Sequence, residues 1–170
     1  TQEILLLLDN LFEKKKLFSA PVYLDSPLAL KITPIFERAL GNDRFNFKEL
    51  VKVARVADSK EIARTAGPKI IIAGSGMSTA GRILGHEKHY LPDRNSIILF
   101  MGYQVAGSLG RQIAEGVKKV WIDRHEVHVR AKVERIDGFS GHADTDALVE
   151  FVSVSASTLK KVFVAMGEPK

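Results

Sequence analysis

The chain has 170 residues, 45% of them hydrophobic, and its 25 Lys and Arg side chains outnumber 20 Asp and Glu, for a formal charge of +5. This composition excludes a disordered chain, and the length fits one domain or slightly more. The absence of cysteine excludes disulfides and thiolate metal sites, and it fits the cytoplasm, where we expect the protein to reside. The basic charge favours a polyanionic partner, although many basic domains bind no nucleic acid.

The apolar runs of the sequence predict neither a membrane span nor a secretory leader. No apolar run approaches the roughly 18 to 20 residues that cross a bilayer. The apolar stretch 4–8 is too short for a secretory leader, and acidic residues follow it at Asp9 and Glu13. We therefore expect no membrane partner.

The first predicted elements are a helix and a short strand. Apolar residues at helical spacing predict an amphipathic helix that begins near Ile4 and closes at Lys14 to Lys16. Residues 21–24 predict a short buried strand. Ser26 is the expected N-cap of the next helix, and Pro34 is expected to kink or shorten it.

The stretch from Phe45 to Val56 is ambiguous, although its apolar cluster indicates a strand. Asp58 and Glu61 have capping-box spacing, which predicts a short helix after them.

Two successive units of strand, glycine turn and helix follow. The first combines an apolar run with a turn at Gly74–Gly81 and a helix through Leu84; the second combines another run with Gly102-Tyr103-Gln104 and a helix over 109–114. The predicted strands cover 69–73 and 96–101. These units predict an α/β fold with a mostly parallel sheet and helices on both faces.

The segment near residues 120–136 has a different pattern. Apolar and polar residues alternate there, which predicts short antiparallel strands with one solvated face. A helix over 146–152 and a buried strand over 161–165 are expected next. A parallel strand with no covering helix after it looks truncated.

The Gly74–Gly81 turn resembles a nucleotide-binding loop only in part. Its spacing is G-x-G-x-x-x-x-G, which differs from the dinucleotide fingerprint, and it lacks the Gly-Lys-Ser/Thr of a P-loop. A tight strand-to-helix turn with close backbone packing is the favoured interpretation. Nucleotide binding stays open, because the N–H groups of the turn are able to face a phosphate.

The histidines do not predict a metal site. His86 and His89 are three residues apart and share a helix face, but no third ligand lies nearby, so we favour a solvated helix end. His125 and His128 point to opposite faces of a strand and are expected to be ordinary strand residues.

The turn Gly138-Phe139-Ser140-Gly141-His142-Ala143-Asp144 leaves a strand just before a helix. Backbone N–H groups at such a turn can hold an anion while an imidazole supplies a proton or a contact. The alternative is a capping turn with a structural histidine.

Four motifs in order carry a family resemblance. They are Pro21-Val-Tyr-Leu-Asp-Ser-Pro-Leu-Ala29, Ala73-Gly-Ser-Gly-Met77 with Gly81-Arg82-Ile83-Leu84, Gly102-Tyr103-Gln104, and Gly138-Phe-Ser-Gly-His-Ala143. The chain resembles the β-CASP branch of metallo-β-lactamase-fold nucleases, closest to bacterial and archaeal RNA-processing members related to the messenger RNA 3′-end cleavage factor. The resemblance implies a β-CASP domain over residues 1–137 and a partial return into the metallo-β-lactamase fold over 138–170.

The resemblance also implies roles for the last motif. His142 is the counterpart of the motif B histidine, which contacts the scissile phosphate beside two zinc ions. Ser140, Gly141 and Ala143 are the counterparts of residues that help to hold phosphate. Preorganised donors of this kind stabilise the charge that develops on phosphate oxygens during hydrolysis.

The chain departs from the family in its metal ligands. The His-x-His-x-Asp-His signature is absent, and Met166 stands where a metal-ligating histidine often occurs; a thioether is a poor zinc ligand. We therefore expect no cofactor in this chain, zinc in a longer parent protein, and no catalysis by the chain alone. The simplest interpretation is a fragment of a zinc-dependent ribonuclease, endonuclease or exonuclease.

The expected partners are single-stranded RNA and the missing metallo-β-lactamase domain of the same polypeptide; a homodimer is an assembly that the resemblance allows. Arg82, Lys88 and Arg111 are candidates to line an RNA groove, and solvated surface charge is the equal alternative. Two other functions stay open: a noncatalytic nucleic-acid-binding or partner subunit, which Met166 favours, and a nucleotide-binding α/β domain that uses Gly74–Gly81.

Overall fold

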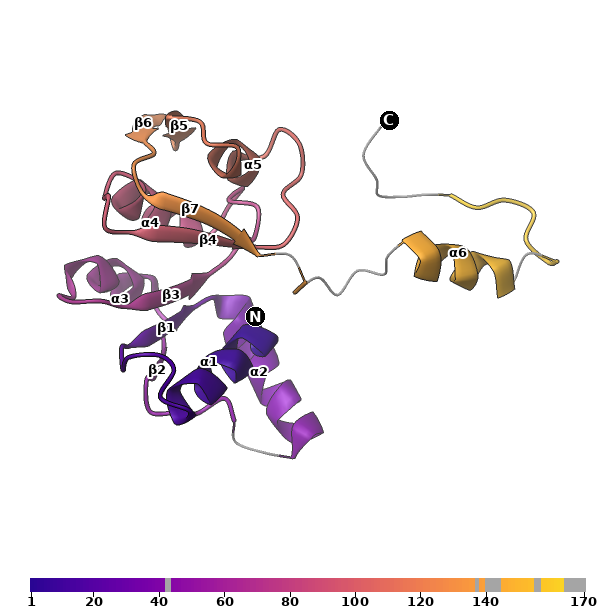
Figure 1. Ribbon diagram of the computed structural model, residues 1–170, viewed down its shortest axis with the longest axis horizontal. Helices are drawn as coiled ribbons and strands as arrows, with labels where there is room; N and C mark the ends of the chain where they lie inside the picture. Colours follow the sequence, from indigo (N-terminus) through magenta and orange to yellow (C-terminus); the bar gives the residue numbers. More distant parts are fainter. Residues whose placement is uncertain (42–43, 137, 140–144, 155–156, 164–170) are drawn as a thin grey trace.

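The computed structural model describes residues 1–41, 44–136, 138–139, 145–154 and 157–163. Helices and short strands alternate along most of this length (Figure 1). The helices are α1 (Gln2–Glu13), α2 (Pro27–Leu40), α3 (Val56–Glu61), α4 (Ile83–Tyr90), α5 (Leu109–Ala114) and α6 (Thr145–Val154), with a 3₁₀ turn at Ile62–Arg64. The strands are β1 (Val22–Asp25), β2 (Leu50–Lys52), β3 (Ile70–Ala73), β4 (Ile97–Met101), β5 (Lys119–Ile122), β6 (His125–His128) and β7 (Lys132–Ile136).

Three strands from the first half of the chain form one parallel sheet in the order β2-β1-β3. The central strand β1 is almost fully buried because it has a neighbour on each side, and Val22 lies opposite both Leu50 and Ile70. Leu5, Leu24, Ala29 and Phe45 form the hydrophobic core beneath it. This core joins α1 and α2 to the sheet.

The second half of the chain contains a parallel pair, β4 with β7, in which Met101 lies opposite Ile136. The prediction that all strands over 120–136 are antiparallel is therefore wrong for β7. Alternation of apolar and polar residues reports one solvated face, and that pattern is the same for either strand direction. The α/β class and the mostly parallel pairing are confirmed, but the described strands form three separate sheets.

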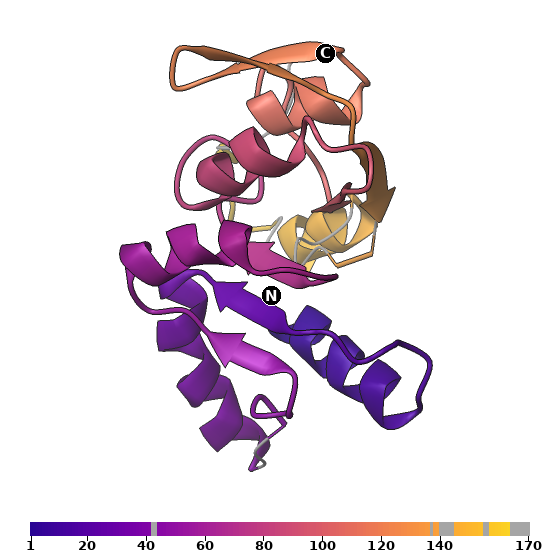
Figure 2. The same cartoon turned by 90° about the vertical axis from the view of Figure 1, so that its left-hand side faces the viewer.

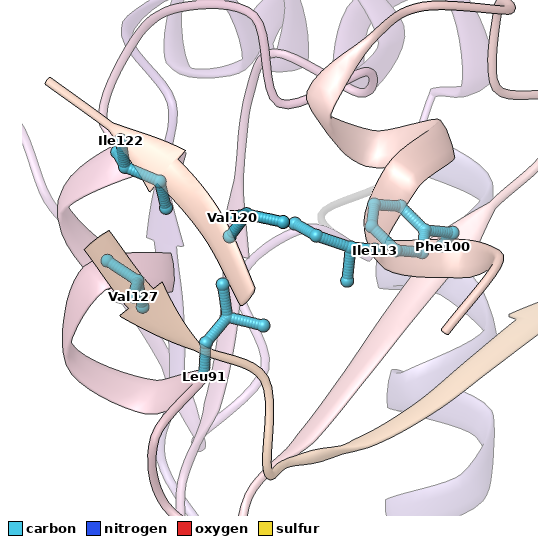
Figure 3. Close-up of a cluster of buried hydrophobic side chains, with 6 residues drawn as sticks. All are labelled: Leu91, Phe100, Ile113, Val120, Ile122 and Val127. Atoms are coloured by element: carbon cyan, nitrogen blue, oxygen red, sulfur yellow. The ribbon is translucent and has the colours of Figure 1, made fainter. Parts of the chain in front are cut away.

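An antiparallel hairpin, β5 with β6, packs against the same half. Its two-residue turn is Asp123-Arg124, with φ of 48° and 65°, and positive φ at both positions matches the right-handed twist of the strands. Inward residues of both strands enter a core that Figure 3 shows from one side. That core consists of Leu91, Phe100, Ile113, Val120, Ile122 and Val127.

Figure 1 shows α1, α2 and α3 beside β1, β2 and β3, and α4 and α5 beside β4 and β7. Figure 2, turned by 90°, shows these two groups one above the other. Among the described residues no helix is long and apolar enough to cross a membrane.

Several predicted helix limits change in the structure. Ser26 caps α2 as expected, accepting from the Ala29 N–H at 3.3 Å, but α2 continues through Pro34 to Leu40. Burial of Ala29 and Thr33 on the inner face of α2 offsets the hydrogen bond that proline removes.

The capping-box prediction is also wrong, because Asp58 and Glu61 lie inside α3 and Asp58 pairs instead with Arg55 at 2.7 Å. The helix after the Gly74–Gly81 turn begins at Ile83 and ends at Tyr90, so it extends beyond Leu84. The helix expected over 146–152 is present as α6. Residues 161–163 do not form the expected strand, and residues 164 and 165 lie outside the described part.

Candidate functional site

A fully buried carboxylate, Asp25, ends β1 at the carboxyl edge of the parallel sheet. Its Oδ2 accepts from the Ser59 hydroxyl at 2.5 Å and lies 2.6 Å from His86 Nε2, while its Oδ1 accepts from Arg82 Nη1 at 2.5 Å. Burial disfavours the charged form, but the hydrogen bonds from Ser59, His86 and Arg82 outweigh it and hold the pKa of Asp25 below its ordinary value. Asp25 is therefore an ionised hub that joins β1, α3 and α4.

Arg82 extends this hub to the segment after β2. Its Nη1 also donates to the Val53 carbonyl at 2.9 Å, and its Nη2 donates to the Ala54 carbonyl at 2.6 Å. Only 12% of its side chain is exposed. Through these contacts Arg82 joins its own segment to the end of β1 and to the segment after β2. Its contact with RNA stays a prediction.

The expectation of a solvated helix end at His86 and His89 is wrong for His86. Its side chain is buried against Asp25, whereas His89 is exposed and packs edge-on against the Tyr90 ring at 4.7 Å between centroids. Within the described ranges, no three His, Asp or Glu side chains lie close enough to hold a metal ion. The described residues therefore do not fit a zinc centre.

The Gly74–Gly81 turn is closely packed on itself, as the favoured interpretation expects. Gly81 has φ of +85°, and a Cβ there would lie 2.6 Å from the Gly74 carbonyl oxygen. The Ser75 hydroxyl accepts from the N–H groups of Thr79 and Ala80, and Ser75 N–H donates to the Ala80 carbonyl. These internal bonds occupy donors that a phosphate would need, which disfavours the nucleotide-binding alternative.

The third motif, Gly102-Tyr103-Gln104, meets this turn. Gln104 Nε2 donates to the Gly76 carbonyl at 2.8 Å, and the Gly110 N–H donates to the Met77 carbonyl at 3.1 Å. A Cβ at Gly110 would lie 2.1 Å from Gln104 Oε1. The turns after β3 and β4 are therefore locked together at one edge of the fold.

A second buried carboxylate, Glu87, lies in α4 and is 1% exposed. Its Oε1 accepts from the Ser78 hydroxyl, and Oε2 has no hydrogen-bond partner among the described residues. Burial raises the pKa of Glu87 to about 7, although the Ser78 hydrogen bond opposes the shift. Glu87 therefore changes charge near neutral pH.

Sequence reasoning did not identify Asp25, Ser59 or Glu87 as site residues. Asp25 directly follows an apolar strand run and precedes a helix cap, which was its one available signal. The partners of Asp25 lie 34 to 61 residues away in the chain, so no local pattern indicates them.

The other predicted groove residues form exposed ion pairs. Lys88 Nζ lies 2.7 Å from Asp123 Oδ2, and Arg111 Nε lies 2.6 Å from Glu115 Oε1. Both cations remain about one-third exposed, so their contact with RNA stays a prediction.

The predicted phosphate turn and the methionine at the predicted metal position lie outside the described residues, so their roles stay predictions. These residues are His142, Ser140, Gly141, Ala143 and Met166. The strand that precedes that turn in the sequence, β7, is described. Because Met101 lies opposite Ile136 in a parallel pair, β7 ends at the same edge where β4 leads into Gly102.

Comparison with known proteins identifies the family to which this fold belongs. Residues 1–113 match the Beta-Casp domain, and residues 126–170 match the Zn-dependent metallo-hydrolase RNA specificity domain. The chain belongs to the β-CASP family of metallo-β-lactamase-fold RNA nucleases.

Among its relatives, ribonuclease TTHA0252 of Thermus thermophilus is 38% identical over a region that covers 78% of this chain and 34% of the relative. Transcription termination factor FttA is 29% identical in Methanocaldococcus jannaschii and 30% identical in Pyrococcus abyssi, covering 98% and 99% of this chain. The chain spans only about a third of the length of these relatives, with 29% of each FttA covered.

Proposed function

We propose that this chain is the RNA-clamping part of a zinc-dependent ribonuclease and that it supplies the phosphate-contacting histidine, His142. The observation that carries the proposal is that the motifs follow the carboxyl ends of parallel strands in two sheets and contact one another there. Asp25 ends β1, the Gly74–Gly81 turn follows β3, and Gln104 follows β4. In parallel sheets, ligands bind beyond the carboxyl ends of the strands.

The contacts between these motifs support a rigid RNA-facing edge. Arg82 binds Asp25, and Gln104 binds Gly76, so the first three motifs are held together by side chains. The strand that precedes the fourth motif, β7, ends beside the strand that precedes the third, because β4 and β7 are paired in parallel. A rigid edge keeps phosphate-binding groups in position before the substrate arrives, which lowers the barrier to hydrolysis.

The metal chemistry belongs to the part of the protein beyond this chain. Zinc would polarise the phosphate and activate water there. Our proposal gives this chain the binding and orientation of RNA, with His142 as a phosphate contact assisted by Ser140, Gly141 and Ala143. The domain boundary at residues 137 and 138 and residence in the cytoplasm are part of the same proposal.

The direct test is His142→Ala in the full-length protein, with RNA cleavage measured in the presence of zinc. We expect cleavage to fall by roughly 100-fold or more, which is typical of a lost proton donor or phosphate contact. His89→Ala is the matched control, since His89 is an exposed histidine outside the motifs, and it should cleave normally. Wild-type cleavage by His142→Ala would exclude the proposed role.

The second candidate is a noncatalytic partner subunit. Met166 favours it, because methionine replaces a residue type that binds zinc well. Metal analysis distinguishes the two candidates: the full-length protein should contain stoichiometric zinc if it is a nuclease, while the 170-residue chain alone should not. Stoichiometric zinc in the chain alone would contradict the fragment interpretation.

A further inference from the structure

Trp121 is the one tryptophan of the chain, and it lies on the outer face of the β5–β6 hairpin. Its neighbours Val120 and Ile122 are each 1% exposed, whereas Trp121 is 67% exposed. Alternation along β5 directs the valine and isoleucine into the core, where Figure 3 shows them, and turns the indole to solvent. Core packing therefore does not explain a tryptophan at this position.

A groove of about 300 Å³ runs beside the indole. Its lining combines apolar residues, among them Trp121 and Leu109, with polar residues, among them Thr79, Ser108 and Asp123. Thr79 belongs to the Gly74–Gly81 turn, so the groove connects the hairpin with the motif-bearing edge. A flat ring with apolar faces and polar edges fits such a lining.

The hairpin around Trp121 is basic. Residues 118–130 contain four cations, Lys118, Lys119, Arg124 and Arg130, against two acids, Asp123 and Glu126. Lys119 Nζ pairs with Glu126 Oε1 at 2.8 Å, while Arg124 and Arg130 are exposed and have no ion pair with any residue that the structure describes. Cations beside an exposed aromatic ring are the combination that binds the backbone and bases of single strands.

We propose that Trp121 is a stacking platform for a base of single-stranded RNA, with the neighbouring groove receiving the base edge and Arg124 and Arg130 attracting the phosphates. This inference rests on the proposed RNA-binding function and adds a binding site on the hairpin. The proposed site lies outside the four motifs, except that Leu84 of the second motif also lines the groove.

Tryptophan emission tests the proposal directly because the chain has a single tryptophan. The 170-residue chain is titrated with an oligoadenylate of about twelve nucleotides, a length within the usual site size of single-strand binders. Stacking of adenine on the indole should quench the emission in a saturable way. The same ribose-phosphate chain without bases should bind weakly and leave the emission unchanged.

Variants separate stacking from charge. Trp121→Ala should weaken binding of fluorescein-labelled oligoadenylate, followed by anisotropy, by roughly 5- to 100-fold, while Trp121→Phe should stay close to the wild type. The dependence of affinity on salt should be the same in all three proteins, because stacking releases no counterions. Phe18→Ala is the control, since Phe18 is another exposed aromatic residue and should not affect binding.

The possible outcomes are distinguishable. If the chain binds RNA with unchanged emission and Trp121→Ala binds equally well, the stacking site is excluded and the proposed function survives. If the chain binds no RNA by anisotropy, both proposals fail. A blue shift of the emission that grows with protein concentration without RNA, together with unchanged RNA affinity in Trp121→Ala, would assign the surface to a protein contact and overturn the stacking site.

Discussion

His86 Nε2 lies 2.6 Å from Asp25 Oδ2, although 61 positions separate the two residues in the chain. The imidazole comes from α4 and the carboxylate from the end of β1, so this contact joins the first motif to the helix that follows the second. Arg82, the N-cap residue of α4, binds the other carboxylate oxygen. The edge that carries the proposed RNA contacts is therefore held by a buried ionic network.

Removing the charge of Asp25 should destabilise the chain strongly. Asp25→Asn leaves the buried guanidinium of Arg82 without its counter-ion, and breaking a buried pair in this way costs about 3–5 kcal/mol. Urea denaturation followed by circular dichroism measures the loss. Asp58→Asn is the matched control, because the exposed Asp58–Arg55 pair should contribute far less. Equal losses in the two variants would contradict the structural role of Asp25.

Protonation of the same carboxylate should lower the free energy of unfolding at acid pH. The pKa of Asp25 is lowered in the folded chain, so its contribution is complete above the unfolded value of 3.8 and disappears as the pH falls through the lower folded value. Wild-type stability should therefore fall relative to Asp25→Asn below about pH 4. The measurement is the difference between the unfolding free energies of the two proteins from pH 6 to pH 2.5. A constant difference would show that Asp25 has the same pKa in both states.

Glu87 should act in the opposite direction. Its folded pKa is raised from 4.5 to about 7, so the folded chain keeps a proton that the unfolded chain releases. The contribution of Glu87 to the free energy of unfolding is complete below pH 4.5. This contribution falls by about 3 kcal/mol as the pH rises through about 7.

Glu87→Gln tests this prediction. The glutamine keeps an oxygen that accepts from Ser78 but does not titrate, so the variant should be more stable than the wild type at pH 8 and about equal at pH 4. Taking the difference between the two proteins cancels the titration of the histidines. A difference that does not change between pH 4 and pH 8 would exclude the raised pKa.

Gly81 should tolerate no side chain. Gly81→Ala places a Cβ 2.6 Å from the Gly74 carbonyl oxygen at a positive φ, and we expect a loss of at least about 2 kcal/mol in thermal or urea unfolding. Two glycines separate the causes. Gly67→Ala has a similar φ of +82° with open space and should lose less, and Gly85→Ala in α4 has open space and should gain up to about 1 kcal/mol. A loss at Gly81 equal to that at Gly67 would exclude the close contact.

The contact between Gln104 and Gly110 should appear as coupling in a double-mutant cycle. Gly110→Ala brings a Cβ within 2.1 Å of Gln104 Oε1, and Gln104→Ala removes that oxygen. The loss in Gly110→Ala should therefore be smaller when Gln104→Ala is also present, with a coupling of about 1 kcal/mol or more. The Met77 carbonyl, at 3.0 Å, should prevent complete rescue. Strict additivity in urea unfolding would contradict the contact.

Local patterns in the sequence predict most of the elements because their causes are local. The apolar runs before Gly74 and Gly102 become β3 and β4, and Ser26 caps α2, since backbone bonds and turn residues act within a few positions. Pro34 does not shorten α2 as one form of the prediction has it, because burial of the helix against its neighbours prevails over the local preference of proline.

The sequence by itself determined the α/β class, the order of the motifs and the family, because hydrophobic periodicity and ordered short motifs are written along the chain. Only the tertiary structure decided that β7 pairs in parallel with β4, that Arg82 and His86 form hydrogen bonds with Asp25, and that burial raises the pKa of Glu87 to about 7. Pairing partners and the dielectric surroundings of a carboxyl group come from residues far away in the sequence. No local pattern contains them.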